Sequence, residues 1–113
     1  MPEKRQHTRF EDFGKIECFD LSPVSGVLED ISLKGCKVHF DSPVSVNTEN
    51  DYELKIRLSR VNLEPLLLIG HPQWVKSSDL STDIGFQFLR SRDTFRLESY
   101  INKLTSEIED INQ

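Results

Sequence analysis

The chain has 113 residues, a length that suits one domain with one hydrophobic core and is short for two. Its 36% hydrophobic and 29% charged residues are typical of globular proteins, and no apolar run is long enough to span a membrane. The net charge of −5, from 19 acidic and 14 basic residues, argues against tight binding to long nucleic acid. Because the N-terminus has no apolar signal-peptide centre, we expect a cytoplasmic protein.

The first 13 residues are polar and terminal, and we expect them to form a flexible arm. From residue 14 to residue 90 apolar and polar residues alternate with period two, which predicts β-strands. The predicted strands include Cys36–Phe40, Tyr52–Ser59, a segment around Trp74, and Ile84–Phe88. Turn-forming residues separate these runs, so residues 14–90 are predicted to form a β-barrel or a β-sandwich.

The apolar spacing becomes helical near the C-terminus, and residues 91–113 are predicted to form a helix that Ser91 or Asp93 caps. The apolar stripe consists of Leu97, Tyr100, Ile101, Leu104, Ile108 and Ile111. This stripe is expected to pack on the sheet or on a partner. Arm, barrel and helix together make one domain over residues 1–113.

The reactive residue types show no catalytic or metal-binding spacing. Cys18 and Cys36 lie in apolar segments and are interpreted as reduced core residues, with a disulfide as the alternative. The three histidines, His7, His39 and His71, lack metal-ligand spacing, so no metal site is predicted. Without a nucleophile–base pair or a glycine-rich phosphate loop, the sequence does not indicate an enzyme.

Two arginines stand four residues apart in the N-terminal arm. No acidic residue lies between Lys4 and Phe10, and the guanidinium groups of Arg5 and Arg9 can each hold a phosphate or a guanine edge through two hydrogen bonds. The pair therefore suits a small dianion. Taken alone, such a pair more often just solvates a surface.

A second polar motif, Asp30-Ile31-Ser32-Leu33-Lys34-Gly35, is interpreted as a strand end, a tight turn and the start of a strand at Lys34 or Gly35. On an extended segment Asp30 and Ser32 project to one face, where a carboxylate can accept from a guanine N–H and a hydroxyl can contact phosphate. Gly35 allows close backbone approach. The alternative is a hairpin turn without a ligand.

Arg-x-x-x-Arg followed by Asp-x-Ser-x-x-Gly resembles the paired signature of the PilZ domain family. Trp74 on a strand after Gly70, the run Ile84–Phe88 and the closing helix are similar to the later elements of that family. The resemblance implies a mainly β fold, a six-stranded antiparallel β-barrel with a C-terminal α-helix. It also implies that cyclic di-GMP is the ligand.

The resemblance assigns the site residues. Arg5 and Arg9 would clamp phosphates and guanine edges, and Asp30, Ser32 and Gly35 would form the facing surface of the barrel. Three further residues, Lys4, Trp74 and Arg90, are candidate contacts. A basic Lys4 before the first arginine favours an intercalated pair of ligands over a single one, and Trp74 can stack on a guanine or pack on the rim.

The resulting hypothesis is a second-messenger receptor with no cofactor, in which cyclic di-GMP orders the arm and creates a surface for a downstream protein. Motility, adhesion or biofilm exopolysaccharide output are the processes that the family suggests. The rival hypothesis is a ligand-independent protein–protein adaptor of the same fold, which acts through the helix or a strand edge.

Overall fold

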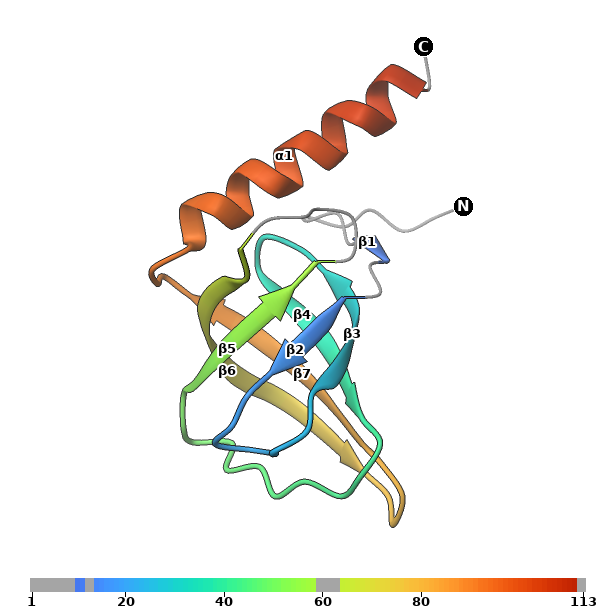
Figure 1. Ribbon diagram of the computed structural model, residues 1–113, viewed down its shortest axis with the longest axis vertical. Helices are drawn as coiled ribbons and strands as arrows, with labels where there is room; N and C mark the ends of the chain where they lie inside the picture. Colours follow the sequence, from blue (N-terminus) through green and yellow to red (C-terminus); the bar gives the residue numbers. More distant parts are fainter. Residues whose placement is uncertain (1–9, 12–13, 59–63, 112–113) are drawn as a thin grey trace.

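The chain forms a β-barrel with an α-helix at one end, as the computed structural model shows (Figure 1). The structure describes residues 10–11, 14–58 and 64–111. Its elements are β1 (Phe10–Glu11), β2 (Lys15–Glu17), β3 (Gly26–Ile31), β4 (Gly35–Phe40), β5 (Tyr52–Arg57), β6 (Leu66–Ser77), β7 (Thr82–Leu89) and α1 (Thr94–Ile111).

The strands are hydrogen-bonded in the order β1-β3-β2-β5-β6-β7-β4, and every pairing is antiparallel. An additional antiparallel pairing of β3 with β4 closes the ring. Six strands therefore form the barrel, and the two-residue β1 is added at the edge of β3. The predicted six-stranded antiparallel barrel with a C-terminal helix is confirmed.

Alternation of apolar and polar residues explains which faces of the strands are buried. In β5 the side chains of Tyr52, Leu54 and Ile56 are buried, whereas the intervening ones face outwards. The same holds in β4 for Cys36, Val38 and Phe40, as predicted. The inward side chains of opposite walls meet in one core, which leaves the outward positions free to carry polar side chains.

The short strand β1 lies within the segment that was predicted to be a flexible arm. Because β2 pairs with β3 only near Val27, the far end of the same β3 edge is open, and β1 fills it. Phe10 pairs with Ile31, and Glu11 pairs with Asp30. The arm is expected to be flexible up to residue 13 when nothing is bound, and the structure places these two residues in a strand.

The helix begins at Thr94, three residues later than predicted. Asp93 stands before its first residue, and its backbone carbonyl accepts a hydrogen bond from Leu97 N at 3.0 Å. Its carboxylate does not cap the helix but accepts from Leu67 N on β6 at 2.7 Å. Ser91 Oγ similarly accepts from Ile69 N at 3.0 Å. Both predicted caps thus attach the start of α1 to β6.

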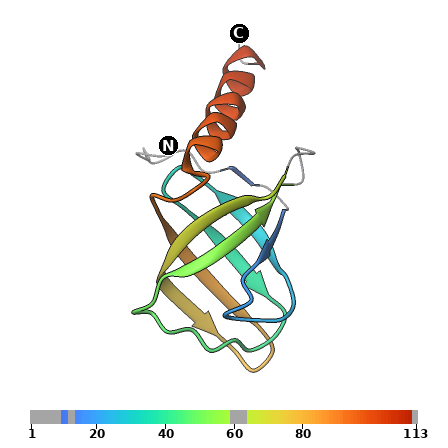
Figure 2. The same ribbon diagram turned by 60° about the vertical axis from the view of Figure 1, so that its left-hand side comes forward.

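The apolar stripe of α1 packs on the barrel. The side chains of Leu97, Tyr100, Ile101 and Leu104 are buried in the same core as the strands. In Figures 1 and 2 the helix starts at the rim of the barrel and its C-terminal part extends beyond it. Among the described residues no helix has the length and hydrophobicity needed to cross a membrane.

Cys18 and Cys36 are both buried and carry free thiols, as predicted. Burial raises the pKa of the Cys18 thiol, which keeps it protonated and unreactive. These cysteines therefore contribute to packing and carry no redox bridge.

Candidate ligand site

Two β-bulges flank the Asp30–Gly35 motif. The register of β3 against β4 shifts at Glu29, and that of β6 against β7 shifts at Gln73. A bulge lets two consecutive side chains point away from the core. Glu29 and Asp30 are accordingly both partly exposed, and Gln73 and Trp74 are both exposed. The bulges thus bring polar and aromatic side chains to one wall of the barrel.

Four residues form a row across that wall. Asp30 on β3 pairs with Lys37 on β4, Lys37 pairs with Gly85 on β7, and Gly85 pairs with Trp74 on β6. Neighbouring partners in a sheet lie about 5 Å apart, so the row spans the wall from the carboxylate to the indole. A glycine in the middle of the row leaves its centre without a side chain.

Two glycines permit close approach at this wall. A Cβ on Gly85 would lie 2.2 Å from Trp74 Nε1, so the indole covers the Gly85 backbone. A Cβ on Gly35 would lie 2.0 Å from the backbone oxygen of Phe86, so β4 and β7 are adjacent only because Gly35 lacks one. Gly35 is therefore a structural requirement of the wall, whereas Gly85 allows the movable indole to lie against the strand.

These residues surround an open hollow of about 510 Å³. Its lining consists of Asp30, Lys34, Gly35, Cys36, Lys37, Gln73, Trp74, Gly85, Phe86 and Gln87. Lys37 Nζ lies 3.4 Å from Glu29 Oε1, and Gln73 Nε2 donates to Gln87 Oε1 at 2.6 Å. The hollow thus offers cations, hydrogen-bonding groups and an aromatic surface to a ligand.

Ser32 does not share the face of Asp30. Its side chain is only 1% exposed, and its Oγ accepts from Lys34 N at 3.2 Å and from Gly35 N at 3.3 Å. The expectation that both side chains project to one face is wrong, because β3 ends at Ile31 and the chain turns at Ser32. The predicted turn and the strand start at Gly35 are confirmed.

The remaining predicted residues lie elsewhere. Arg90 is exposed after the end of β7 and lines a separate notch of about 320 Å³ together with Lys34. Arg5, Arg9 and Lys4 lie outside the described residues. The structure therefore brings together Asp30, Gly35 and Trp74, with Ser32 beneath them in the turn.

Sequence reasoning did not select Lys37, Gln73, Gly85 or Gln87 as site residues. Three of them occupy the outward positions of alternating strands, a pattern that the sequence does show. A glycine at an outward strand position indicates close approach by another group, so Gly85 could have been identified. Gln73 could not, since the bulge that places it has no signal in the alternation.

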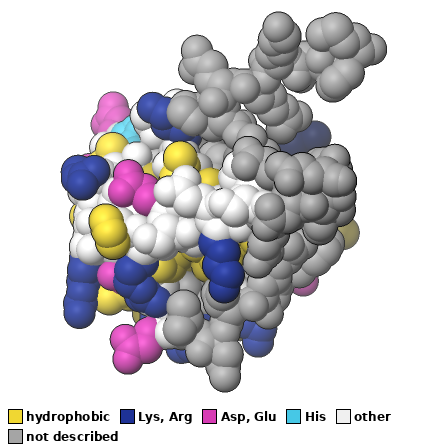
Figure 3. Space-filling view, turned by 90° about the horizontal axis from the view of Figure 1, so that it is seen from above, with side chains coloured by type: hydrophobic (Ala, Val, Ile, Leu, Met, Phe, Trp, Pro, Cys, Tyr) yellow, Lys and Arg dark blue, Asp and Glu magenta, His cyan; other side chains and the backbone are white. Residues whose placement is uncertain are grey.

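At the hollow, the lysines of the lining outnumber its one carboxylate, Asp30, although Lys37 also lies beside Glu29. Viewed from above, Lys and Arg side chains predominate over Asp and Glu on the visible described surface (Figure 3). Lys34 and Lys37 contribute two such cations to the hollow itself. The net charge of −5 therefore does not describe this region.

An ionisable cluster lies further along the same wall. His39 Nδ1 lies 2.6 Å from Asp83 Oδ1, and His39 Nε2 lies 2.8 Å from Asp41 Oδ1. The hydrogen bonds to Asp83 and Asp41 raise the pKa of His39 above its usual range. Within the described ranges no three metal-binding side chains converge, so this cluster is an ion-pair network.

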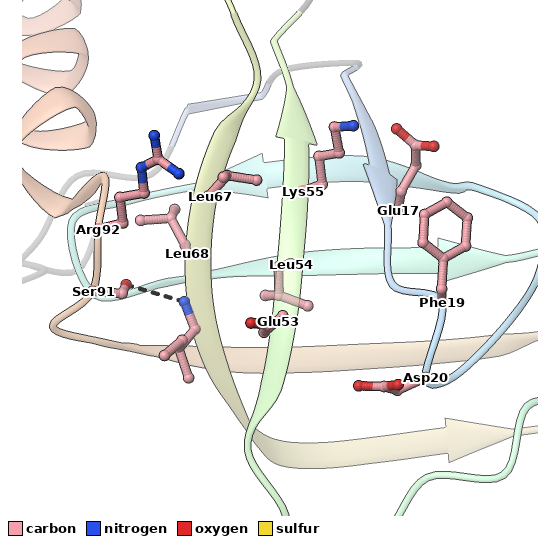
Figure 4. Close-up of a pocket in the computed structure, with 11 residues that line it drawn as sticks. Glu17, Phe19, Asp20, Glu53, Leu54, Lys55, Leu67, Leu68, Ser91 and Arg92 are labelled. Atoms are coloured by element: carbon pink, nitrogen blue, oxygen red, sulfur yellow. Dashed lines mark hydrogen bonds between the residues drawn. The ribbon is translucent and has the colours of Figure 1, made fainter.

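A second hollow of about 380 Å³ occupies the opposite wall, over β2, β5 and the first half of β6 (Figure 4). It contains both acidic and basic side chains, such as Glu17 and Lys55, beside the apolar Phe19 and Leu67. None of the predicted ligand-binding residues that the structure describes lines it.

Comparison with known families decides the classification. The model of the PilZ domain family matches residues 3–103, which is most of the chain. The chain belongs to the PilZ domain family. No curated protein sequence matches it.

Solved structures share the PilZ fold at low sequence identity. The PilZ domain of Escherichia coli YcgR, solved with c-di-GMP, has a TM-score of 0.62 and 15% identity, and the match covers 97% of this chain and 98% of that one. MotI (DgrA) of Bacillus subtilis, an inhibitor of motility, has a TM-score of 0.68 and 13% identity, with 94% of this chain and 53% of that one covered. The PilZ domain of CeSA from a cellulose-synthesizing bacterium has a TM-score of 0.51 and 17% identity, with coverages of 90% and 98%. This PilZ chain thus spans about half the length of MotI.

Proposed function

We propose that this PilZ domain is a receptor for cyclic di-GMP and that the ligand binds in the hollow of the β3–β4–β7 wall. The observation that carries the proposal is the meeting of Asp30, Gly35 and Trp74 around one open hollow on that wall. The similar PilZ domain of YcgR was solved with c-di-GMP, which supports the choice of this ligand among nucleotides.

The N-terminal arm joins the barrel beside the end of β3, next to the proposed ligand site. Phe10 pairs with Ile31 and Glu11 with Asp30, so Arg9 is joined to the chain beside the end of β3. One residue spans about 3.8 Å, and an arginine side chain adds further reach. The guanidinium groups of Arg9 and Arg5 would then close over a ligand that rests against the hollow.

The chemistry of the hollow suits a cyclic dinucleotide. Arginine forks bind phosphates and guanine edges, Lys34 and Lys37 add positive charge, and the indole of Trp74 can stack on a base. The proposed role of Ser32 is indirect, because its hydroxyl fixes the turn that presents Lys34 and Gly35. Binding and ordering of the arm would be one event, with charge-assisted bonds offsetting the lost chain entropy.

Isothermal titration tests the proposal. The chain is titrated with cyclic di-GMP, cyclic di-AMP and GTP, alongside an Arg5→Ala/Arg9→Ala variant. Each arginine is expected to contribute about 2–3 kcal/mol, roughly thirtyfold to more than a hundredfold in affinity, so the double variant should show no binding. Lys4→Ala is expected to cost less than either, and the stoichiometry distinguishes one ligand from an intercalated pair.

Absence of heat at tens of micromolar ligand with a folded protein would contradict the receptor function. The ligand-independent adaptor would then account for the fold, and a complex with a partner protein would form equally well without nucleotide. A downstream partner, a role in motility or biofilm formation and a cytoplasmic location belong to the receptor proposal. Conversion of the ligand to a linear product would contradict a purely binding role.

A further inference from the structure

A hydrogen-bonded pair of glutamines lies inside the hollow and is not part of either predicted motif. Gln73, the bulge residue of β6, donates from Nε2 to Gln87 Oε1 on β7 at 2.6 Å. Gln87 is also the register partner of Gly35, so the pair borders the Asp30–Gly35 motif. We call Gln73 and Gln87 the glutamine clasp.

The clasp changes what Gln87 can offer to a ligand. A free glutamine amide has one acceptor oxygen and two N–H donors, and it pairs with adenine by donating to N7 and accepting from the N6 amino group. In the clasp the oxygen of Gln87 is turned towards Gln73 and accepts a hydrogen bond from it, which fixes the orientation of the Gln87 amide. Among the described residues the Nε2 group of Gln87 has no hydrogen-bond partner. Because the oxygen and the nitrogen lie on opposite sides of an amide, the Nε2 donors of Gln87 face away from Gln73 and remain available to a ligand in the hollow.

Guanine and adenine differ in their response to such a donor group. The edge of guanine that carries N7 and O6 has two acceptors, whereas the corresponding edge of adenine has the N7 acceptor and the N6–H donors. An amide held with its N–H donors towards the ligand matches the first edge and opposes the N6–H donors of the second. A polar group left unpaired on ligand binding is costly, so this mismatch discriminates between the bases.

The position of the clasp beside the indole fits this role. Gln73 and Trp74 follow one another at the bulge, and the indole lies over Gly85, two residues before Gln87. A base that stacks on the exposed part of the indole would lie beside the clasp. Stacking tolerates any base, since every base has a π face, so selectivity must come from a group at the base edge.

We propose that the glutamine clasp selects guanine over adenine in the hollow, with Gln87 as the donor to the N7/O6 edge and Gln73 as the residue that holds the Gln87 amide in this orientation. This inference rests on the proposed function and adds to it the residues that set base selectivity. The arginine and Asp30–Gly35 motifs are not needed for the argument.

Titration of Gln87→Leu and Gln73→Leu with cyclic di-GMP and cyclic di-AMP tests the proposal. Gln87→Leu is expected to weaken cyclic di-GMP binding about tenfold. Gln73→Leu lets the Gln87 amide turn its oxygen towards the ligand, so the ratio of the two affinities should fall about tenfold in favour of the adenine ligand. Lys76→Ala, an exposed change on the same strand outside the hollow, serves as the control and should leave both affinities unchanged.

Cyclic di-IMP identifies the edge that is contacted, because hypoxanthine keeps N7 and O6 but lacks the 2-amino group. The wild-type chain is expected to bind it within about threefold of cyclic di-GMP. An unchanged affinity ratio in Gln73→Leu, or equal weakening of both dinucleotides in Gln87→Leu, would overturn the clasp while leaving the receptor function intact. No binding of any dinucleotide by the folded wild-type chain would overturn both.

Discussion

Both walls of the barrel consist of strands in which apolar and polar residues alternate, but the side chains on their outer faces differ. The wall of β2, β5 and the first half of β6 has full-sized outward side chains, such as Leu67 and the Glu17–Arg57 ion pair at 3.2 Å. The wall of β3, β4 and β7 has Gly35 and Gly85 instead, with a bulge on either side. The candidate site on this barrel therefore lies where glycines take the place of outward side chains.

The largest expected effect comes from restoring a side chain at Gly35. In Gly35→Ala the new Cβ would meet the backbone oxygen of Phe86, which cannot rotate away, so β4 and β7 must separate. We expect a loss of about 1–3 kcal/mol in the free energy of unfolding, measured by urea denaturation. Gly85→Ala is the control, since its Cβ meets the side chain of Trp74, which can move. An unchanged urea midpoint for Gly35→Ala would contradict the proposed structural difference between the two walls.

Filling the hollow should affect the ligand more than the fold. Gly85→Val displaces the indole of Trp74 and occupies the centre of the row. On the proposed function we expect at least a tenfold loss of cyclic di-GMP affinity, about 1.4 kcal/mol, in a calorimetric titration. Lys55→Val places the same side chain on the opposite wall and should leave the affinity unchanged. Equal affinities in the two variants would show that the hollow is not the site.

The smallest expected effect is on the pH dependence of stability, and it concerns His39 on the β3–β4–β7 wall. Asp83 and Asp41 raise the pKa of His39, so the protonated ring stabilises the fold. This stabilisation is complete below the unfolded pKa of about 6.5 and is lost as the pH rises through the higher folded pKa. The urea midpoint should therefore fall between about pH 6 and pH 8 more steeply in the wild type than in His39→Gln. Asp83→Asn should also flatten the profile, and identical slopes in all three proteins would contradict this assignment.

Alternation of apolar and polar residues was sufficient to predict the buried faces of β4, β5 and β7, because each of these strands has one side that faces solvent. Alternation did not predict the position of Ser32. Because β3 ends at Ile31, the side chain of Ser32 is buried in the turn and does not lie on the face of Asp30. Alternation also failed at Gln73, because a bulge depends on how β6 meets β7 and Pro72 offers no ladder hydrogen bond there. Motif spacing identified Asp30 and Gly35, but tertiary pairing alone brings Lys37 and Gln87 to them.

The attachment of α1 limits how this domain can signal. Four buried side chains of the helix close the end of the barrel, and burying them stabilises the fold by at least about 6 kcal/mol at roughly 1.5 kcal/mol each. A ligand at a hundred times its Kd supplies only about 2.7 kcal/mol to a conformational change. Release of the helix would also break the bonds of Asp93 and Ser91 to β6. On the proposed function the helix would stay attached to the barrel, and a partner would sense the ligand through the newly covered surface of the hollow.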